Sequence, residues 1–160
     1  ALYDMPGNDL ECMRMIEDLP KHIIAKGTVD IRGELYGKGL IPARSQRLAA
    51  GHLRKKQPSG MGLSFCAFQI FDAKGTEVSN LQQLVKWGFH VCGYIKIDKD
   101  VVNRVKKLHS QWQDSLIFSR YPTDGIVVKV LDKDLQDKIG RTSIAPSWAT
   151  AIKDTWKKTW

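Results

Sequence analysis

The chain has 160 residues, enough to bury one domain core, and no Pro/Gly/Ser-rich linker divides it, so residues 1–160 are predicted to form one domain. Its 25 Lys and Arg residues outnumber 17 Asp and Glu residues, and the formal net charge of +8 favours an anionic partner such as a nucleotide or nucleic acid. No apolar run reaches the length of a membrane span and no signal-peptide pattern opens the chain, so a cytoplasmic protein without a membrane partner is expected.

The cysteines and histidines do not have the spacing of a metal site. Cys12, Cys66 and Cys92 lie far apart without a CxxC pair, and the four histidines are equally scattered. The sequence therefore predicts neither a metal site held by protein side chains nor a disulfide framework. We expect the three thiols to be buried or half-buried.

The first half of the chain predicts two strands, each next to a helical segment. Residues 8–20 carry apolar side chains near helical spacing between an Asn/Asp cap and a proline stop, which predicts a helix. Residues 28–37 alternate briefly and end in glycines, which is typical of a strand that runs into a loop. A cation-rich short helix or turn is expected at 47–56, and the apolar run 63–71 is expected to be a strand buried on both faces.

The second half predicts three helices and two strands. The helices are expected at 80–88, 100–116 and 133–140, and the strands at 125–130 and 148–154. Asn80 is the predicted N-cap of the first of these helices, and Gly88 its C-terminal glycine. The interleaving follows no repeat and predicts an α+β fold with a mainly antiparallel sheet core and flanking helices.

Three predicted strands carry charged side chains where core residues are expected: Arg32 and Glu34, Asp124 and Lys129, and Lys153. A lysine is costly to bury unless an anion meets it, although an edge-strand lysine can also reach water. One interpretation is a pocket at converging sheet ends, where lysines neutralise a phosphate and carboxylates bind hydroxyls or a hydrated magnesium ion. The alternative is a salt-bridge network without a ligand.

Six stretches of the chain, in order, are similar to successive motifs of one family: DIRGELYG, RLAAGHLRK, LSFCAFQI, LQQLVKWGFHV, YPTDGIVVKV and IGRTSIAPSWATAIK. They resemble the nucleotidyltransferase, or adenylation, domain of NAD-dependent bacterial DNA ligases over nearly the whole chain. The resemblance implies an ATP-grasp-like nucleotidyltransferase fold. It also implies an enzyme that seals nicks in double-stranded DNA through lysyl-AMP and DNA-adenylate intermediates, with NAD as the AMP donor, Mg²⁺ as a cofactor, and a cytoplasmic, nucleoid-associated location.

The resemblance also implies roles for individual residues. Glu34 corresponds to the glutamate that holds the ribose, and Phe68 takes the place of the aromatic residue that stacks on adenine. Asp124, Lys129 and Lys153 match the acidic residue and the two lysines of the last two motifs, and are the expected catalytic residues. The lysines are expected to approach the α-phosphate, which would explain a cation inside the strand IVVKV.

A basic edge is the expected DNA contact. Arg54 matches the family arginine after the alanine run, and Lys55 and Lys56 extend it into a track for the DNA backbone. The alternative is a solvated cationic turn.

The chain departs from the family pattern at the nucleophile. The family attacks the adenylyl phosphate with the lysine of a KxDG motif, whereas the nearest match, GYIKIDKD at 93–100, lacks the glycine and lies on the wrong side of the RGE strand. We therefore expect a partial domain, incomplete at the N-terminus, that binds nucleotide without forming the adduct itself. The nucleophile is expected on a missing N-terminal segment or on another chain. The alternatives are a non-catalytic nucleic-acid-binding remnant and an ATP-dependent ligase relative.

Overall fold

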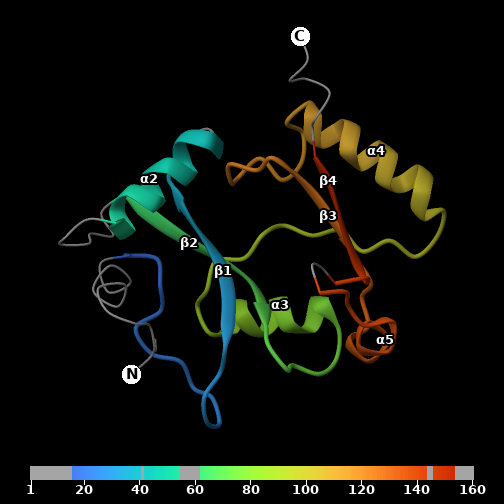
Figure 1. The fold of residues 1–160 in the computed structure, drawn as a ribbon, viewed down its shortest axis with the longest axis horizontal. Helices are drawn as coiled ribbons and strands as arrows, with labels where there is room; N and C mark the ends of the chain where they lie inside the picture. The colour runs from blue at the N-terminus through green and yellow to red at the C-terminus, as the bar shows by residue number, and fades with distance from the viewer. Residues whose placement is uncertain (1–15, 41, 55–61, 144–145, 154–160) are drawn as a thin grey trace.

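The strands of the computed structural model, which describes residues 16–40, 42–54, 62–143 and 146–153, form two separate two-stranded antiparallel sheets (Figure 1). In the first sheet β1 (Ile31–Gly37) pairs with β2 (Leu63–Ile70), and in the second β3 (Gly125–Lys129) pairs with β4 (Ala149–Lys153). The helices are α2 (Pro42–Arg54), α3 (Glu77–Lys86), α4 (Val101–Gln113) and α5 (Lys133–Ile139). The predicted α+β class with antiparallel strands is confirmed.

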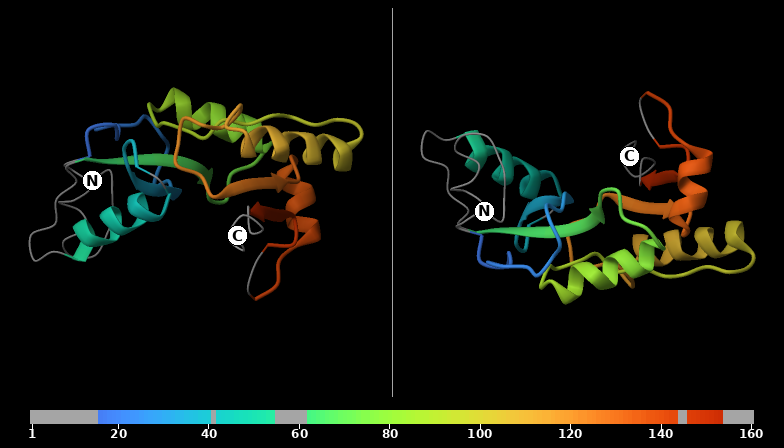
Figure 2. Two further views of the ribbon diagram at one scale, coloured as in Figure 1. Left: turned by 90° about the horizontal axis from the view of Figure 1, so that it is seen from above. Right: turned by 90° about the horizontal axis from the view of Figure 1, so that it is seen from below.

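The hydrophobic core gathers around β2. All five residues from Leu63 to Ala67 are buried, which confirms the prediction of a strand covered on both faces. Figure 2 shows α3 and α4 on one side of the strands and α2 on the other. The buried apolar cluster consists of Ile16, Leu19, Ala49, Leu63, Phe65, Ala67, Ile70, Leu84 and Phe89.

The second sheet is thinly packed and is attached to the first half of the chain mainly by polar contacts. No residue of β3 or β4 is buried, and Val127 is 58% exposed. The segment between β3 and α5 pairs instead with the start of α3, where the Glu77 N–H donates to the Leu131 carbonyl at 2.8 Å. Lys133 N–H donates to the Gly75 carbonyl at 2.9 Å. These bonds fix β3 and α5 relative to α3.

The helix predicted over residues 8–20 is wrong in the part that the structure describes. Residues 16–19 form a turn, and residues 1–15 lie outside the described residues. The turn is held because the Asp18 carboxylate accepts a hydrogen bond from the Phe65 N–H at 3.3 Å, while Ile16 and Leu19 enter the core. A tertiary contact thus replaces the helical continuation that the apolar spacing suggested.

Two helix ends also differ from the prediction. α3 begins after Thr76, whose side chain accepts from the Ser79 N–H while the Ser79 hydroxyl accepts from the Thr76 N–H, and Asn80 lies buried inside the helix. This reciprocal capping box outweighs the Asn80 signal. At the other end, α4 stops at Gln113, so Leu116 lies beyond it and is 70% exposed.

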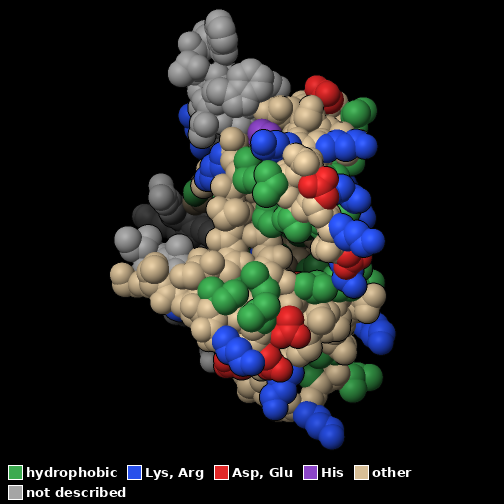
Figure 3. All heavy atoms as spheres, turned by 90° about the vertical axis from the view of Figure 1, so that its right-hand side faces the viewer, with side chains coloured by type: hydrophobic (Ala, Val, Ile, Leu, Met, Phe, Trp, Pro, Cys, Tyr) green, Lys and Arg blue, Asp and Glu red, His purple; other side chains and the backbone are tan. Residues whose placement is uncertain are grey.

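The cations of α4 are open to solvent. Arg104, Lys106 and Lys107 are exposed, and Figure 3 shows Lys and Arg side chains interspersed with acidic and hydrophobic ones on this side of the molecule. A solvated helix face accounts for this mixture. Within the described ranges, none of the helices has the length and apolar character needed to span a bilayer.

Candidate functional site

The two sheets meet where Phe68 of β2 approaches Lys129 of β3. The Lys129 ammonium nitrogen lies 5.9 Å from the centroid of the Phe68 ring, within cation–π range. Phe68 sits at a β-bulge, because Arg32 pairs with Gln69 and Gly33 pairs with Ala67, leaving Phe68 as the extra residue. A bulge re-aims a side chain. The result is a half-buried, flat apolar ring next to a cation supplied by a different sheet.

Glu34 of β1 brings a carboxylate to the same sheet as Phe68. It pairs with Cys66 in the β1–β2 register, two residues before Phe68 along β2. Its neighbours in the strand, Gly33 and Leu35, pair with the core residues Ala67 and Phe65, so Glu34 faces away from the core and is exposed. A hydroxyl-bearing ligand at the Phe68 ring could therefore meet this carboxylate.

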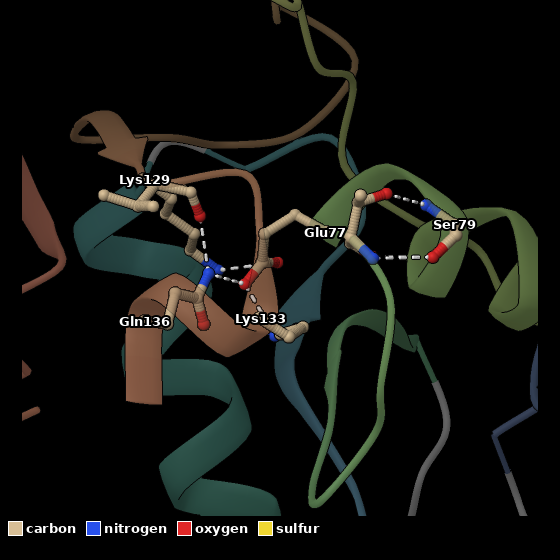
Figure 4. A network of polar contacts seen from close by, with 7 residues as sticks. Glu77, Ser79, Lys129, Lys133 and Gln136 are labelled. Atoms are coloured by element: carbon tan, nitrogen blue, oxygen red, sulfur yellow. Dashed lines mark hydrogen bonds and ion pairs between the residues drawn. The ribbon is translucent and has the colours of Figure 1, made fainter. Parts of the chain in front are cut away.

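Lys129 also has an anionic partner within the protein, namely Glu77 at the start of α3. The Lys129 Nζ lies 3.7 Å from Glu77 Oε2, and the Lys133 Nζ donates to Glu77 Oε1 at 2.7 Å. Gln136 Nε2 donates to Glu77 Oε1 at 2.8 Å and to the Val130 carbonyl at 2.6 Å. Figure 4 shows the Glu77 carboxylate reaching into the space between these three side chains. Lys129 thus takes part in a salt-bridge network with Glu77, Lys133 and Gln136 in this arrangement.

The charge state of Glu77 follows from these contacts. Burial by itself raises the pKa of this carboxyl, because it disfavours the ionised form. The hydrogen bonds from Lys133 and Gln136 and the positive charges of Lys133 and Lys129 outweigh burial and lower the pKa of Glu77 below its ordinary value. Glu77 is therefore ionised at neutral pH and is the anion that permits two lysines to lie here.

Lys153 and Asp124 lie at the other end of the second sheet. Lys153 pairs with Gly125 in the register whereas Lys129 pairs with Ala149, so the lysines occupy one face of the ribbon four residues apart, which is about 13 Å along a strand. The Lys153 Nζ lies 3.6 Å from Asp124 Oδ2, and the two side chains are 60% and 72% exposed. The expected convergence of Lys129 and Lys153 on one anion is not seen, because each lysine is paired with its own carboxylate.

The predicted DNA edge lies mostly outside the described residues. Arg54 is the last residue of α2, and its side chain, together with Lys55 and Lys56, belongs to the part that is not described. The assignment of this edge to DNA stays a prediction.

The sequence analysis missed several residues that surround the site. Glu77, Lys133 and Gln136 carried only a weak signal, the spacing of Lys133 and Gln136 on one face of α5. Cys66 and Cys92 are 26 positions apart in sequence, yet their sulfur atoms lie 3.0 Å apart. Both groups are brought together by packing between elements that are distant along the chain.

The described residues do not provide a cluster of metal ligands. They contain no group of three or more His, Cys, Asp or Glu side chains that could hold a metal ion. We therefore assign no protein ligands to the Mg²⁺ expected from the resemblance.

Comparison with known proteins identifies the family. A family model described as the NAD-dependent DNA ligase adenylation domain matches residues 37–155, which include Phe68, Asp124, Lys129 and Lys153. The chain belongs to this family. The match begins after Glu34, so the role of Glu34 depends on the DIRGELYG motif alone.

Individual relatives of this adenylation-domain chain are DNA ligases from diverse organisms. The DNA ligase of Halothermothrix orenii is 28% identical over 163 residues, covering 88% of this chain and 24% of that protein. Those of Cytophaga hutchinsonii and Saccharophagus degradans are 32% identical over 149 residues and 31% identical over 176 residues. They cover 84% and 92% of this chain, and 22% and 26% of those proteins. The chain thus spans about a quarter of the length of these relatives.

Proposed function

We propose that this chain binds the adenylate part of NAD, as the adenylation domain of a DNA ligase that seals nicks. The observation that carries the proposal is the contact between Phe68 and Lys129 across the two sheets. A flat apolar ring next to a cation supports the proposal, because stacking on a base and pairing with a phosphate are the two interactions that recognise a mononucleotide. The family match covers both residues.

In this proposal each residue has a distinct part. The Phe68 ring stacks on adenine, Lys129 pairs with the α-phosphate, and the Glu34 carboxylate accepts hydrogen bonds from ribose hydroxyls. Lys153 lies on the sheet face that Lys129 shares, at its far end, and would reach toward the phosphate as its ion pair with Asp124 opens. That pair is solvent-exposed and therefore weak.

To pair with a phosphate, the Lys129 side chain must turn away from Glu77, and the free-energy cost of this movement is small. The carboxylate is held at 2.7 Å by Lys133 and only at 3.7 Å by Lys129. When Lys129 turns to a phosphate, Glu77 therefore keeps a charged partner and two hydrogen bonds. A buried carboxylate left without any partner would oppose the movement strongly.

The ligase reaction also needs a nucleophilic lysine and nicked DNA. The 160 residues contain no KxDG motif, so we propose that the nucleophile comes from a separate segment and that this chain alone forms no covalent adduct. Incubation with NAD followed by intact-mass spectrometry tests this point, and a chain heavier by one AMP would contradict it. Nicked duplex DNA is the proposed polynucleotide substrate, with Arg54, Lys55 and Lys56 along its backbone.

Nucleotide titrations test the binding site directly. AMP and NAD should bind to the chain, and Phe68→Ala and Lys129→Gln should each weaken AMP binding about tenfold. The first removes base stacking, which contributes roughly 1–3 kcal/mol, and the second removes the charge that pairs with the phosphate. Calorimetry or nucleotide-induced fluorescence changes give the affinities. Tighter binding of ATP than of NAD would favour the ATP-dependent alternative.

Two matched controls make the titration specific. Phe71 is a 43% exposed phenylalanine with its own cation, Arg32, at 5.6 Å from the ring centroid, and Lys106 is an exposed lysine of α4. Phe71→Ala and Lys106→Gln should leave the AMP affinity unchanged. If the controls lower it as much as the site variants do, the proposed site is wrong.

A further inference from the structure

Two free cysteine sulfurs are in contact beside the candidate nucleotide site. Cys66 Sγ and Cys92 Sγ lie 3.0 Å apart, and a disulfide bond needs about 2 Å. The contact is set by the backbone, because the Ala67 N–H donates to the His90 carbonyl at 2.8 Å and Ala67 bridges to Val91. Cys66 and Cys92 flank this bridge, so a small movement of two side chains suffices for bond formation.

We propose that Cys66 and Cys92 form a redox modification site, at which hydrogen peroxide closes a disulfide that weakens nucleotide binding. Neither residue has a part in the adenylate contacts proposed above. The effect on the nucleotide rests on the proposed function, whereas formation of the disulfide does not.

The two thiols differ in exposure and in pKa, and these differences indicate which one reacts first with peroxide. Cys92 is partly exposed and Cys66 is buried. The hydrogen bond with Cys66, and then the positive charge of Lys129, lower the pKa of Cys92 despite burial. The same hydrogen bond and burial raise the pKa of Cys66. Cys92 is therefore the more accessible and more acidic thiol, which reacts first through its thiolate form, and Cys66 is the thiol that resolves the product.

The chemistry balances with peroxide as the only oxidant. The Cys92 thiolate attacks one peroxide oxygen, the O–O bond breaks, and the products are a sulfenic acid on Cys92 and hydroxide. The Cys66 sulfur then attacks the Cys92 sulfur, and the hydroxyl group leaves as water with the Cys66 proton. A proton from solvent converts the hydroxide to water. Two thiols are oxidised to one disulfide, and one peroxide is reduced to two waters.

The disulfide would affect the nucleotide site because Cys66 and Cys92 are each next to residues proposed to bind the nucleotide. Cys66 pairs with Glu34 in the register and lies two positions before Phe68. The positive charge of Lys129 lowers the pKa of Cys92. Closing the bond turns the Cys66 and Cys92 side chains and fixes them beside Glu34 and Lys129, so that these two residues adjust less readily to a nucleotide. We therefore expect lower AMP affinity in the oxidised chain.

Peptide mapping of the unaltered chain tests the site. Trypsin should separate Cys12, Cys66 and Cys92 into peptides 1–14, 57–74 and 87–96. The chain is treated with equimolar hydrogen peroxide, free thiols are alkylated, and the peptides are identified by mass spectrometry. We expect 57–74 joined to 87–96, with Cys12 alkylated. The same treatment in urea is the control and should give mixed pairings.

Two further measurements keep the outcome clear. Phenylarsine oxide, which binds paired thiols, should bind the folded chain in a one-to-one ratio, and Cys92→Ser, checked for folding by circular dichroism, should lose this binding. The AMP affinity should fall several-fold on oxidation and return after dithiothreitol.

Three outcomes would contradict a part of the proposal. Alkylation of both Cys66 and Cys92 after peroxide treatment, or a predominant link to Cys12, would show that the two residues do not form the proposed modification site. An unchanged AMP affinity in the linked chain would overturn its effect on the nucleotide. Failure of the reduced chain to bind AMP would count against the proposed function alone.

Discussion

At the residue scale, one carboxylate organises the junction between α3, β3 and α5. Glu77 and Lys133 are each only 10% exposed at their side chains, and Gln136 is buried as well. Lys133 also lies over the Trp148 ring at 5.8 Å, so its position is fixed from two directions. Removing the negative charge would leave a buried ammonium group without its counter-charge, which destabilises the folded state.

The first prediction at this scale is that Glu77→Gln destabilises the chain by about 2 kcal/mol at neutral pH, because the amide keeps a hydrogen bond but not the charge. Urea unfolding followed by circular dichroism measures the difference. Asp98→Asn is the matched control, since Asp98 and Lys96 form an exposed surface pair at 3.7 Å. The control should change the free energy of unfolding by less than about 1 kcal/mol. Equal effects of both substitutions would contradict the role of Glu77.

The same carboxylate predicts a pH dependence. Because the folded-state pKa of Glu77 is lowered, the unfolded chain binds the proton more readily, and the stabilisation by Glu77 is fully present above the unfolded pKa of about 4.3. It is lost as the pH falls through the lower folded pKa. The stability difference between the unaltered chain and Glu77→Gln should therefore shrink below about pH 4. A difference that stays constant into stronger acid would argue against an ionised Glu77.

At the element scale, the β3–β4 ribbon depends on close backbone approach at its ends. A β-carbon on Gly125 would meet the Ile152 carbonyl and lie 3.0 Å from the Lys153 Cα. Only glycine permits this strand pair to close beside Lys153. The motif glycine that follows Asp124 therefore has a steric reason to be there.

Two glycine substitutions should consequently have opposite effects. Gly125→Ala should destabilise the chain by about 1–3 kcal/mol, because the strands must separate to admit the methyl group. Gly51→Ala lies in the interior of α2, where the added carbon meets no other part of the described residues within 4 Å beyond its own helix turn. This substitution should stabilise the chain by up to about 1 kcal/mol. Thermal unfolding measures both. The steric account would be wrong if Gly125→Ala were neutral.

At the scale of the whole molecule, the net charge of +8 bears on DNA binding. A positive net charge favours binding to any polyanion. The slope of log affinity against log salt, by contrast, depends on how many phosphates the protein contacts. The basic edge begins at Arg54, the last residue of α2, and continues with Lys55 and Lys56, whereas Arg104, Lys106 and Lys107 are exposed cations of α4. DNA binding can therefore be compared between two variants that each lose three cations, one set from the basic edge and one set from α4.

Replacing Arg54, Lys55 and Lys56 by alanine should reduce the slope of log affinity against log salt for nicked duplex DNA by about 2–3, because each phosphate contact contributes roughly 0.9. Fluorescence polarisation between about 50 and 200 mM salt gives the slope. The matched variant replaces Arg104, Lys106 and Lys107, removes the same charge and should leave the slope nearly unchanged. Similar losses in both variants would indicate binding through net charge alone.

Features with a local cause could be predicted from the sequence. Strand β2 was predicted from its unbroken apolar run, and the strand at Gly125–Lys129 from β-branched residues after a turn. The order of six motifs also pointed to the family, because each motif combines a local backbone requirement with a chemical group. The capping box of Thr76 and Ser79 is a local signal too, whereas Asn80 predicts a helix start that lies too far along the chain.

Contacts between distant segments were decided only by the tertiary structure. The sequence showed that Lys129 needs an anion, but the choice of Glu77, 52 positions earlier, depends on how α3 docks against β3 and α5. The turn at Ile16–Leu19 follows from the Asp18 contact with β2, and the meeting of Cys66 with Cys92 follows from the Ala67–Val91 bridge. Periodicity and motifs report on neighbours along the chain. The partner of a buried charge or thiol is set by sheet register and packing, which no short stretch of sequence encodes.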